Sequence, residues 1–264
     1  MALTQPKNSG VVVSIRGRDA ADQQLPLLPL RVDATIPSPF GSADLKSFVQ
    51  TLDGHIYALK SLQDGPYLPA SEFLCYKLAS ACGLPVPYSA LIEETVKGPI
   101  GFGSRFEGGV MDPATLNTAD QLDMFRESKG PVSAILALDC FVGNDDRHRR
   151  NFIFRKNFQL RWVPLAIDYS RAFLVRGFPE DIFPLPPSSN TQRTIDILKK
   201  SDMWDGPYAV FALESLASVT SAHLKHWFDE MPEEWLSING RKKLIAWWES
   251  QQFSARLQKV LQVI

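Results

Sequence analysis

The chain has 264 residues, of which 45% are hydrophobic and 22% charged, and its 28 basic and 29 acidic residues give a net charge of −1. These values are typical of a globular protein and fit either one large domain or a two-lobed unit. They give no indication of a nucleic-acid-binding surface or a polybasic membrane anchor. We therefore expect no direct nucleic-acid binding and no membrane partner.

The expected location follows from the absence of targeting signals. No apolar run approaches the ~20 residues of a membrane span, and the polar first ten residues lack the pattern of a signal peptide. Cys75, Cys82 and Cys140 lie in apolar segments without paired metal-ligand spacing. We expect a cytoplasmic protein with buried, reduced thiols.

Short strands are predicted in the first part of the chain. The β-branched residues of segment 10–18 are typical of an edge strand, and residues 30–62 predict three further strands. Between these three we expect turns at residues 37–46 and at Asp53-Gly54, the second being a strong hairpin signal. The third strand, residues 55–60, ends on Lys60.

A helix is predicted next, with an N-cap at Ser71 and a C-terminal cap at Gly83. This start places Glu72 in the first turn, and Pro85 stops any continuation. Residues 88–94 and 99–106 then predict two more strands. The first part of the chain therefore predicts a small, mostly antiparallel sheet with one helix packed on it.

Helical patterns dominate the second part. Residues 118–130 and 131–143 are helical in pattern, and the second segment is apolar nearly all round, as in a buried helix. Residues 176–194 are rich in proline and serine and predict an extended loop, and helices follow to residue 264. We predict the α+β class in two lobes, a sheet-rich N-lobe over residues 1–110 and a mainly helical C-lobe over residues 111–264.

The sequence GNDDRHRRNFIF, residues 143–154, carries the main indication of chemistry. An Asn-Asp-Asp run alone is more typical of a turn. Here, however, Asn151 follows Asp146 by five residues, and a predicted strand–turn–strand then leads to Asp168. Phosphoryl transfer needs one carboxylate to position the attacking hydroxyl, with an amide and a second carboxylate to hold Mg²⁺. Asp145 is the alternative acid, but Asp146 has the kinase spacing Asp-x-x-x-x-Asn.

Lys60 and Glu72 are predicted to form a pair between the sheet and its helix. Each has an ordinary explanation by itself, as an edge lysine and as an acid favoured by the helix dipole. Together they match the lysine–glutamate pair that holds the α- and β-phosphates in kinases.

Two further segments are candidates for contacts with the nucleotide. The turn at residues 39–46, with Ser42 and Lys46, is the candidate phosphate cover, although it matches neither glycine-rich phosphate motif. Residues 104–108, with Ser104 and Phe106, are the candidate adenine-binding hinge.

The sequence is compatible with several roles for the basic residues of the central motif. His148 is assigned to the catalytic loop and is interpreted as a brace rather than a proton carrier. Arg147, Arg149 and Arg150 are compatible with solvated surface, with phosphate contacts, or with binding of an acidic or phosphorylated segment.

These motifs resemble those of the HipA-like serine/threonine kinases, and within that group the short, single-module bacterial proteins. The resemblance rests on YALK at 57–60, SEFLCYKLASACGLPVP at 71–87, GNDDRHRRNFIF at 143–154 and LAIDYSRAF at 165–173. The DRHRRN element is also similar to the Asp-Arg-His-x-x-Asn loop of phosphoinositide 3- and 4-kinases, a structurally related group.

The resemblance implies a two-lobed protein-kinase-like fold with ATP and Mg²⁺ as cofactors. It implies Lys60 on the ATP phosphates with Glu72 as its partner, Asp146 as the catalytic acid, and Asn151 and Asp168 as Mg²⁺ ligands. The metal acid lies in Ile-Asp-Tyr-Ser rather than Asp-Phe-Gly.

The expected function is phosphate transfer from ATP to a serine or threonine of an unidentified protein. The resemblance also suggests an antitoxin or regulatory partner, and makes Ser42 the candidate for self-phosphorylation. The alternatives are a kinase for a small molecule or a lipid, and a nucleotide-binding pseudokinase or regulatory module.

Overall fold

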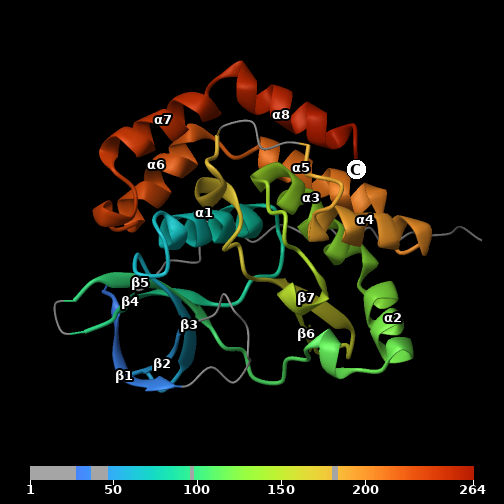
Figure 1. Ribbon diagram of the computed structural model, residues 1–264, viewed down its shortest axis with the longest axis horizontal. Helices are drawn as coiled ribbons and strands as arrows, with labels where there is room; N and C mark the ends of the chain where they lie inside the picture. Colours follow the sequence, from blue (N-terminus) through green and yellow to red (C-terminus); the bar gives the residue numbers. More distant parts are fainter. Residues whose placement is uncertain (1–27, 37–46, 96–97, 180–183) are drawn as a thin grey trace, which may run out of the picture.

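The computed structural model describes residues 28–36, 47–95, 98–179 and 184–264. The strand predicted at residues 10–18 and the turn predicted at residues 37–46 lie outside them. The described chain forms a small barrel of strands beside a larger helical part, which also holds a two-stranded sheet (Figure 1). The predicted α+β class is confirmed.

Five short strands pair mostly antiparallel, as predicted, but they close into a barrel, whereas the sequence predicted a simple sheet. They are β1 (Leu30–Ile36), β2 (Ser47–Thr51), β3 (Ile56–Lys60), β4 (Ser89–Glu93) and β5 (Ile100–Arg105). Their order is β1-β2-β3-β5-β4, and a short parallel pairing of β1 with β4, with Leu30 opposite Ile92, closes the barrel. The simple sheet was wrong because closure depends on a pairing between distant strands, which local alternation does not reveal.

The barrel is narrow, and a few apolar side chains fill its interior: Val49, Tyr57, Leu59, Ala90 and Ile92. Two glycines of β5 allow these side chains to approach the strand. A Cβ on Gly103 would lie 2.5 Å from the side chain of Ile92, and one on Gly101 would lie 2.5 Å from that of Leu59. Small residues on one strand therefore make room for large ones on its neighbours.

Helix α1 (Leu68–Ala81) begins three residues before the predicted N-cap. Tyr67 is the actual N-cap, in the left-handed region with φ of 63°. Ser71 therefore lies inside the helix, where its hydroxyl donates to the carbonyl oxygen of Ala172 at 2.7 Å. Glu72 also lies beyond the first turn, contrary to prediction. The end of the helix agrees with prediction, since Gly83 follows the C-cap with φ of 71°.

The helical part is built around α3 (Lys129–Val142), which is buried along nearly its whole length as predicted. The other helices are α2 (Thr118–Glu127), α4 (Asn190–Lys200), α5 (Gly206–Ala217), α6 (Ser221–Glu230), α7 (Ile238–Trp248) and α8 (Gln251–Leu261), with short 3-10 turns η2 (Pro113–Thr115), η3 (Arg149–Asn151), η4 (Phe173–Arg176) and η5 (Glu233–Trp235). No helix in the described part of the chain is long and apolar enough to cross a membrane.

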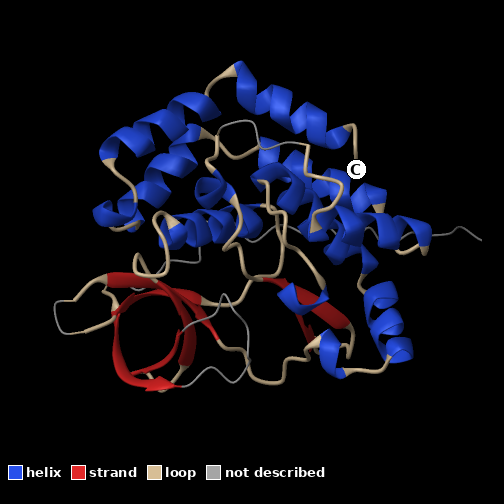
Figure 2. Ribbon diagram, viewed as in Figure 1, coloured by secondary structure: helices blue, strands red, loops and turns tan. Residues whose placement is uncertain are grey.

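Strands β6 (Phe152–Lys156) and β7 (Trp162–Ala166) form the predicted hairpin, with Phe152 opposite Ala166. The hairpin stands apart from the barrel and next to the helices (Figure 2). Because Phe152, directly after η3, pairs with Ala166 at the end of β7, the segment before the hairpin and the segment after it are neighbours.

Helix α1 lies between barrel strands β3 and β4 in the sequence but packs into the core of the helical part. Its apolar residues belong to one buried cluster with those of α3, α5 and the C-terminal helices. Trp235 extends this contact to the barrel, because its indole nitrogen donates to the carbonyl oxygen of Ile100 in β5 at 2.8 Å. Helix α1 thus connects the two parts of the molecule.

Candidate active site

A buried ion pair fixes the loop that carries the acid–amide motif. Asp139, on the last turn of α3, receives hydrogen bonds from Arg147 to both carboxylate oxygens, at 2.8 and 3.0 Å. Both side chains are fully buried. The loop leaves the helix through Gly143, whose φ of 71° is the left-handed conformation that ends many helices. Asn144 adds a hydrogen bond to Asp139 at 2.8 Å.

Arg147 also connects the two segments that were predicted to bind metal. Its Nη1 donates to the carbonyl oxygen of Asn151 at 2.7 Å and to that of Ile167, the residue before Asp168. Its guanidinium lies over the rings of Phe152 and Tyr169. The surface and phosphate-binding interpretations of Arg147 were therefore wrong. Arg149 and Arg150 are exposed.

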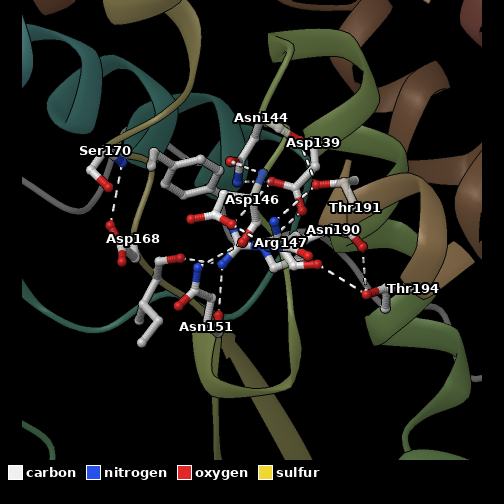
Figure 3. Close-up of polar contacts among 12 residues, drawn as sticks. Asp139, Asn144, Asp146, Arg147, Asn151, Asp168, Ser170, Asn190, Thr191 and Thr194 are labelled. Carbon is white, nitrogen blue, oxygen red and sulfur yellow. Dashed lines mark hydrogen bonds and ion pairs between the residues drawn. The ribbon is translucent and has the colours of Figure 1, made fainter. Parts of the chain in front are cut away.

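The start of α4 holds the same loop from the other side (Figure 3). The Thr191 hydroxyl accepts from the backbone nitrogen of Arg147 at 2.9 Å and donates to the carbonyl oxygen of Asn144 at 2.6 Å. Thr194 donates to the carbonyl oxygen of Arg147 at 3.0 Å. Sequence reasoning assigned these residues to an extended loop, but the helix begins at Asn190 with Ser189 as its N-cap. Ser189 followed by Gln192 was an available signal for that start.

Asp146 lies at the edge of a pocket of about 240 Å³, which Ser188, Ser189 and Asn190 also line. Its carboxylate accepts a hydrogen bond from the Asn190 amide. The second oxygen of Asp146 lies 3.5 Å from Nε of Arg171, whose side chain is half exposed. The carboxylate is thus oriented at the surface of a small polar pocket, where a hydroxyl group can approach it.

Asp145, the alternative acid, lines the same pocket but is paired differently. Its carboxylate lies 3.0 Å from Arg176, and one of its oxygens is buried without a hydrogen-bond partner. Asn151 favours Asp146 as the functional acid, because its amide donates to the backbone oxygen of Asp146 at 2.8 Å and so couples the two residues.

Lys60, Glu72 and Asp168 come together where the barrel meets α1. The Lys60 ammonium lies 3.9 Å from Glu72 and 3.5 Å from Asp168. Lys60 and Glu72 are buried, and Asp168 is a quarter exposed. The backbone nitrogen of Tyr169 donates to Glu72 at 3.1 Å, which brings the segment after β7 against α1.

The two carboxyl groups around Lys60 have opposite pKa shifts. Burial raises the pKa of Glu72 to about 7, against the opposing effect of Lys60, and the charge of Asp168 contributes to the rise. Burial acts in the same direction on Asp168, but Lys60, Ser170 and Arg147 together hold its pKa below the usual value. Asp168 is therefore the carboxylate that stays ionised near neutral pH.

The donor set at Asp168 and Asn151 fits Mg²⁺. The described residues contain no cluster of three or more His, Cys, Asp or Glu side chains able to hold a metal. Mg²⁺ typically uses only one or two protein carboxylates, with phosphate oxygens and water completing the shell. Asp168 supplies an ionised carboxylate, and the Asn151 amide hydrogen bond to Asp146 leaves its oxygen available as a ligand. Asp168 has φ of 57°, a left-handed conformation that aspartate tolerates better than most residues.

The remaining predicted residues lie around this centre or outside the described chain. His148 accepts a hydrogen bond at Nδ1 from the backbone of Arg150 at 3.2 Å, so it contacts its own loop. Ser104 lies on β5 opposite Ala58, and Phe106 follows that strand, packing edge-on against Phe48. Ser42 and Lys46 lie outside the described residues.

Comparisons with known proteins identify the fold. Neither the protein-family models nor the curated proteins match the sequence. Among solved structures, the proinflammatory kinase CtkA of Helicobacter pylori is similar over 90% of this chain and 98% of its own, with 14% identity and a TM-score of 0.57. The HipA protein of Shewanella oneidensis MR-1, solved with HipB and operator DNA, matches 89% of this chain and 68% of its own, with 13% identity and a TM-score of 0.48. The likeness to CtkA shows that the chain has a kinase-like fold.

Proposed function

We propose that the protein is an ATP- and Mg²⁺-dependent kinase that phosphorylates serine or threonine in another protein. The observation that carries the proposal is the arrangement around Arg147. One buried guanidinium joins the backbone at Asn151 to the backbone before Asp168, and the loop that it holds presents Asp146 to a polar pocket. The fold shared with a known kinase agrees with it.

In the proposed reaction, Asp146 receives the proton of the attacking hydroxyl. The hydroxyl oxygen forms a bond to the γ-phosphorus of ATP, the bond from that phosphorus to the bridging oxygen breaks, and ADP leaves. Lys60, oriented by Glu72, would contact the α- and β-phosphates. Asn151 and Asp168 would hold Mg²⁺, which would supply positive charge near the phosphate oxygens.

The direct test is transfer of labelled γ-phosphate from ATP, with the protein alone and with cell lysate, followed by mapping of the labelled residues. We expect label on serine or threonine, and we expect Asp146→Asn to reduce it by about 100- to 10,000-fold because the proton acceptor is lost. Asp145→Asn is the matched control and should keep most of the activity.

Equal incorporation by Asp146→Asn and the parent protein would contradict this role for Asp146. A nucleotide-dependent rise in melting temperature without transfer to any acceptor would instead identify a pseudokinase or regulatory module. Label recovered on a small molecule or lipid would support the other enzymatic alternative.

An antitoxin or regulatory partner is part of the proposal only through the sequence resemblance. Co-purification of the protein with the product of a neighbouring gene would test it.

A further inference from the structure

A second pocket lies beside the one that contains Asp146. It has a volume of about 520 Å³ and is lined by two segments, residues 64–68 at the start of α1 and residues 170–177 after the candidate metal ligand. Arg171 lines both pockets, so they meet at its side chain. We propose that this second pocket binds an apolar side chain of the acceptor, and that the acceptor is therefore an extended peptide crossing Arg171. This inference rests on the proposed kinase function.

The lining of the pocket gives the chemistry of its occupant. Its walls carry Pro66, Tyr67, Leu174 and Val175, and of these Tyr67 is 49% and Val175 39% exposed. Exposed apolar side chains around one concave site favour an apolar ligand, because covering them removes their surface from water. Among the predicted nucleotide contacts that the structure describes, none lines this pocket: Lys60, Ser104, Phe106, Asn151 and Asp168 all lie outside its lining.

The pocket is also held in shape without a ligand. The Ser71 hydroxyl bonds the carbonyl oxygen of Ala172, which joins the 170–177 segment to α1. Phe173 is buried and stacks on Phe178 with ring centroids 4.2 Å apart. A preformed pocket avoids the entropic cost of ordering its walls on binding.

The position of Arg171 between the two pockets favours an extended peptide over a compact molecule as the acceptor. The pocket of about 240 Å³ at Asp146 accommodates one hydroxyl-bearing side chain, and the neighbouring pocket is about twice as large. An extended peptide advances roughly 3.3 Å per residue and can place side chains in both. Between them, the half-exposed Arg171 guanidinium offers donors to peptide carbonyl oxygens.

The test is binding to an array of serine-centred peptides in which each flanking position carries leucine, phenylalanine, serine or aspartate in turn. Without ATP, we expect the protein to favour leucine or phenylalanine at one flanking side. Val175→Glu places a carboxylate in the pocket and should weaken binding of these peptides about tenfold while peptides with polar flanks change little. Ile238→Glu, an equally radical change at an exposed position on α7, should leave the pattern unchanged.

Tyr67→Asn is the second variant, because asparagine tolerates the left-handed backbone at this position while removing the aromatic wall. It should also weaken the apolar preference, and melting temperatures will show whether either variant is unfolded. No apolar preference in the parent protein, or the same preference in both folded variants, would overturn the inference.

Phosphate transfer to the same array separates this inference from the proposed function. Phosphate transfer to the peptides without a preference for apolar flanking residues would support the kinase function and contradict the second subsite. Binding that prefers apolar flanking residues, without phosphate transfer to any peptide or lysate protein, would support the subsite and contradict the kinase function.

Discussion

Two groups of charged residues hold the centre of this molecule, and they are built differently. Asp139 and Arg147 form a neutral pair with two short hydrogen bonds and no exposure to solvent. Lys60, Glu72 and Asp168 combine one cation with two carboxyl groups at longer separations, and Asp168 reaches the surface. The first group has its charges balanced within the protein. The second has two carboxyl groups for one ammonium group, which suits the binding of a cation from outside.

The largest expected effect comes from breaking the balanced pair. Arg147→Met should lower the free energy of unfolding by about 3–5 kcal/mol, because Asp139 would remain buried without its partner. Urea denaturation measures this change. Arg149→Met removes an exposed arginine two residues away and should change stability by less than about 0.5 kcal/mol. Equal stabilities for the two variants would show that the buried pair does not support the fold.

The second group should instead make the stability of the protein depend on pH. The pKa of Glu72 is about 7 in the folded protein, above its ordinary value of 4.5. The folded state then binds this proton more tightly than the unfolded state, so the contribution of Glu72 to stability is present at low pH and is lost as pH rises through about 7. Between pH 5 and 8, the stability of the parent protein should fall relative to Glu72→Gln by about 2–3 kcal/mol.

The comparison of these two proteins cancels the titration of most other groups, and urea denaturation at several pH values provides the data. A constant difference between them across this range would mean that Glu72 titrates normally. In that case, the two charged groups would not differ in how they affect the pH dependence of stability.

A smaller effect is expected at the contact between α4 and the loop. Thr191→Val keeps the shape of the side chain but removes the partner of the Arg147 backbone nitrogen and the Asn144 carbonyl oxygen. Loss of these buried hydrogen bonds should lower stability by about 1–3 kcal/mol. Thr118→Val, at an exposed helix position, is the control. A Thr191→Val protein as stable as this control would show that α4 does not contribute to holding the loop.

Local patterns predicted much of the fold. The β6–β7 hairpin, the buried helix before the loop and the helix end at Gly83 follow from apolar periodicity and glycine chemistry, which act over a few residues. Helix starts were less accurate. Helix α1 begins before the predicted Ser71, because its actual N-cap, Tyr67, is not one of the usual capping residues. Helix α4 begins before Thr194, because the proline-rich segment in front of Ser189 favoured the prediction of a loop.

The role of Arg147 shows most clearly what local patterns omit. In the sequence it is one of three arginines in a charged run, and residue type and local hydropathy do not indicate that it, unlike Arg149 and Arg150, is buried. Only the structure shows that it is buried, because its partner Asp139 lies in the preceding helix and its other acceptors, the carbonyl oxygens of Asn151 and Ile167, lie at the two ends of the hairpin.

The sequence by itself determined the residue types and spacings of the candidate site: an acid, an amide five residues later, a second acid after a hairpin, and a lysine–glutamate pair on a strand and a helix. These features are local, so short-range geometry is enough to propose them. The tertiary structure decided that the strands close into a barrel, that Lys60 reaches Asp168 as well as Glu72, and that α4 supports the loop at Asp146. Each of these depends on contacts between residues far apart in the chain, which form only when the whole core packs.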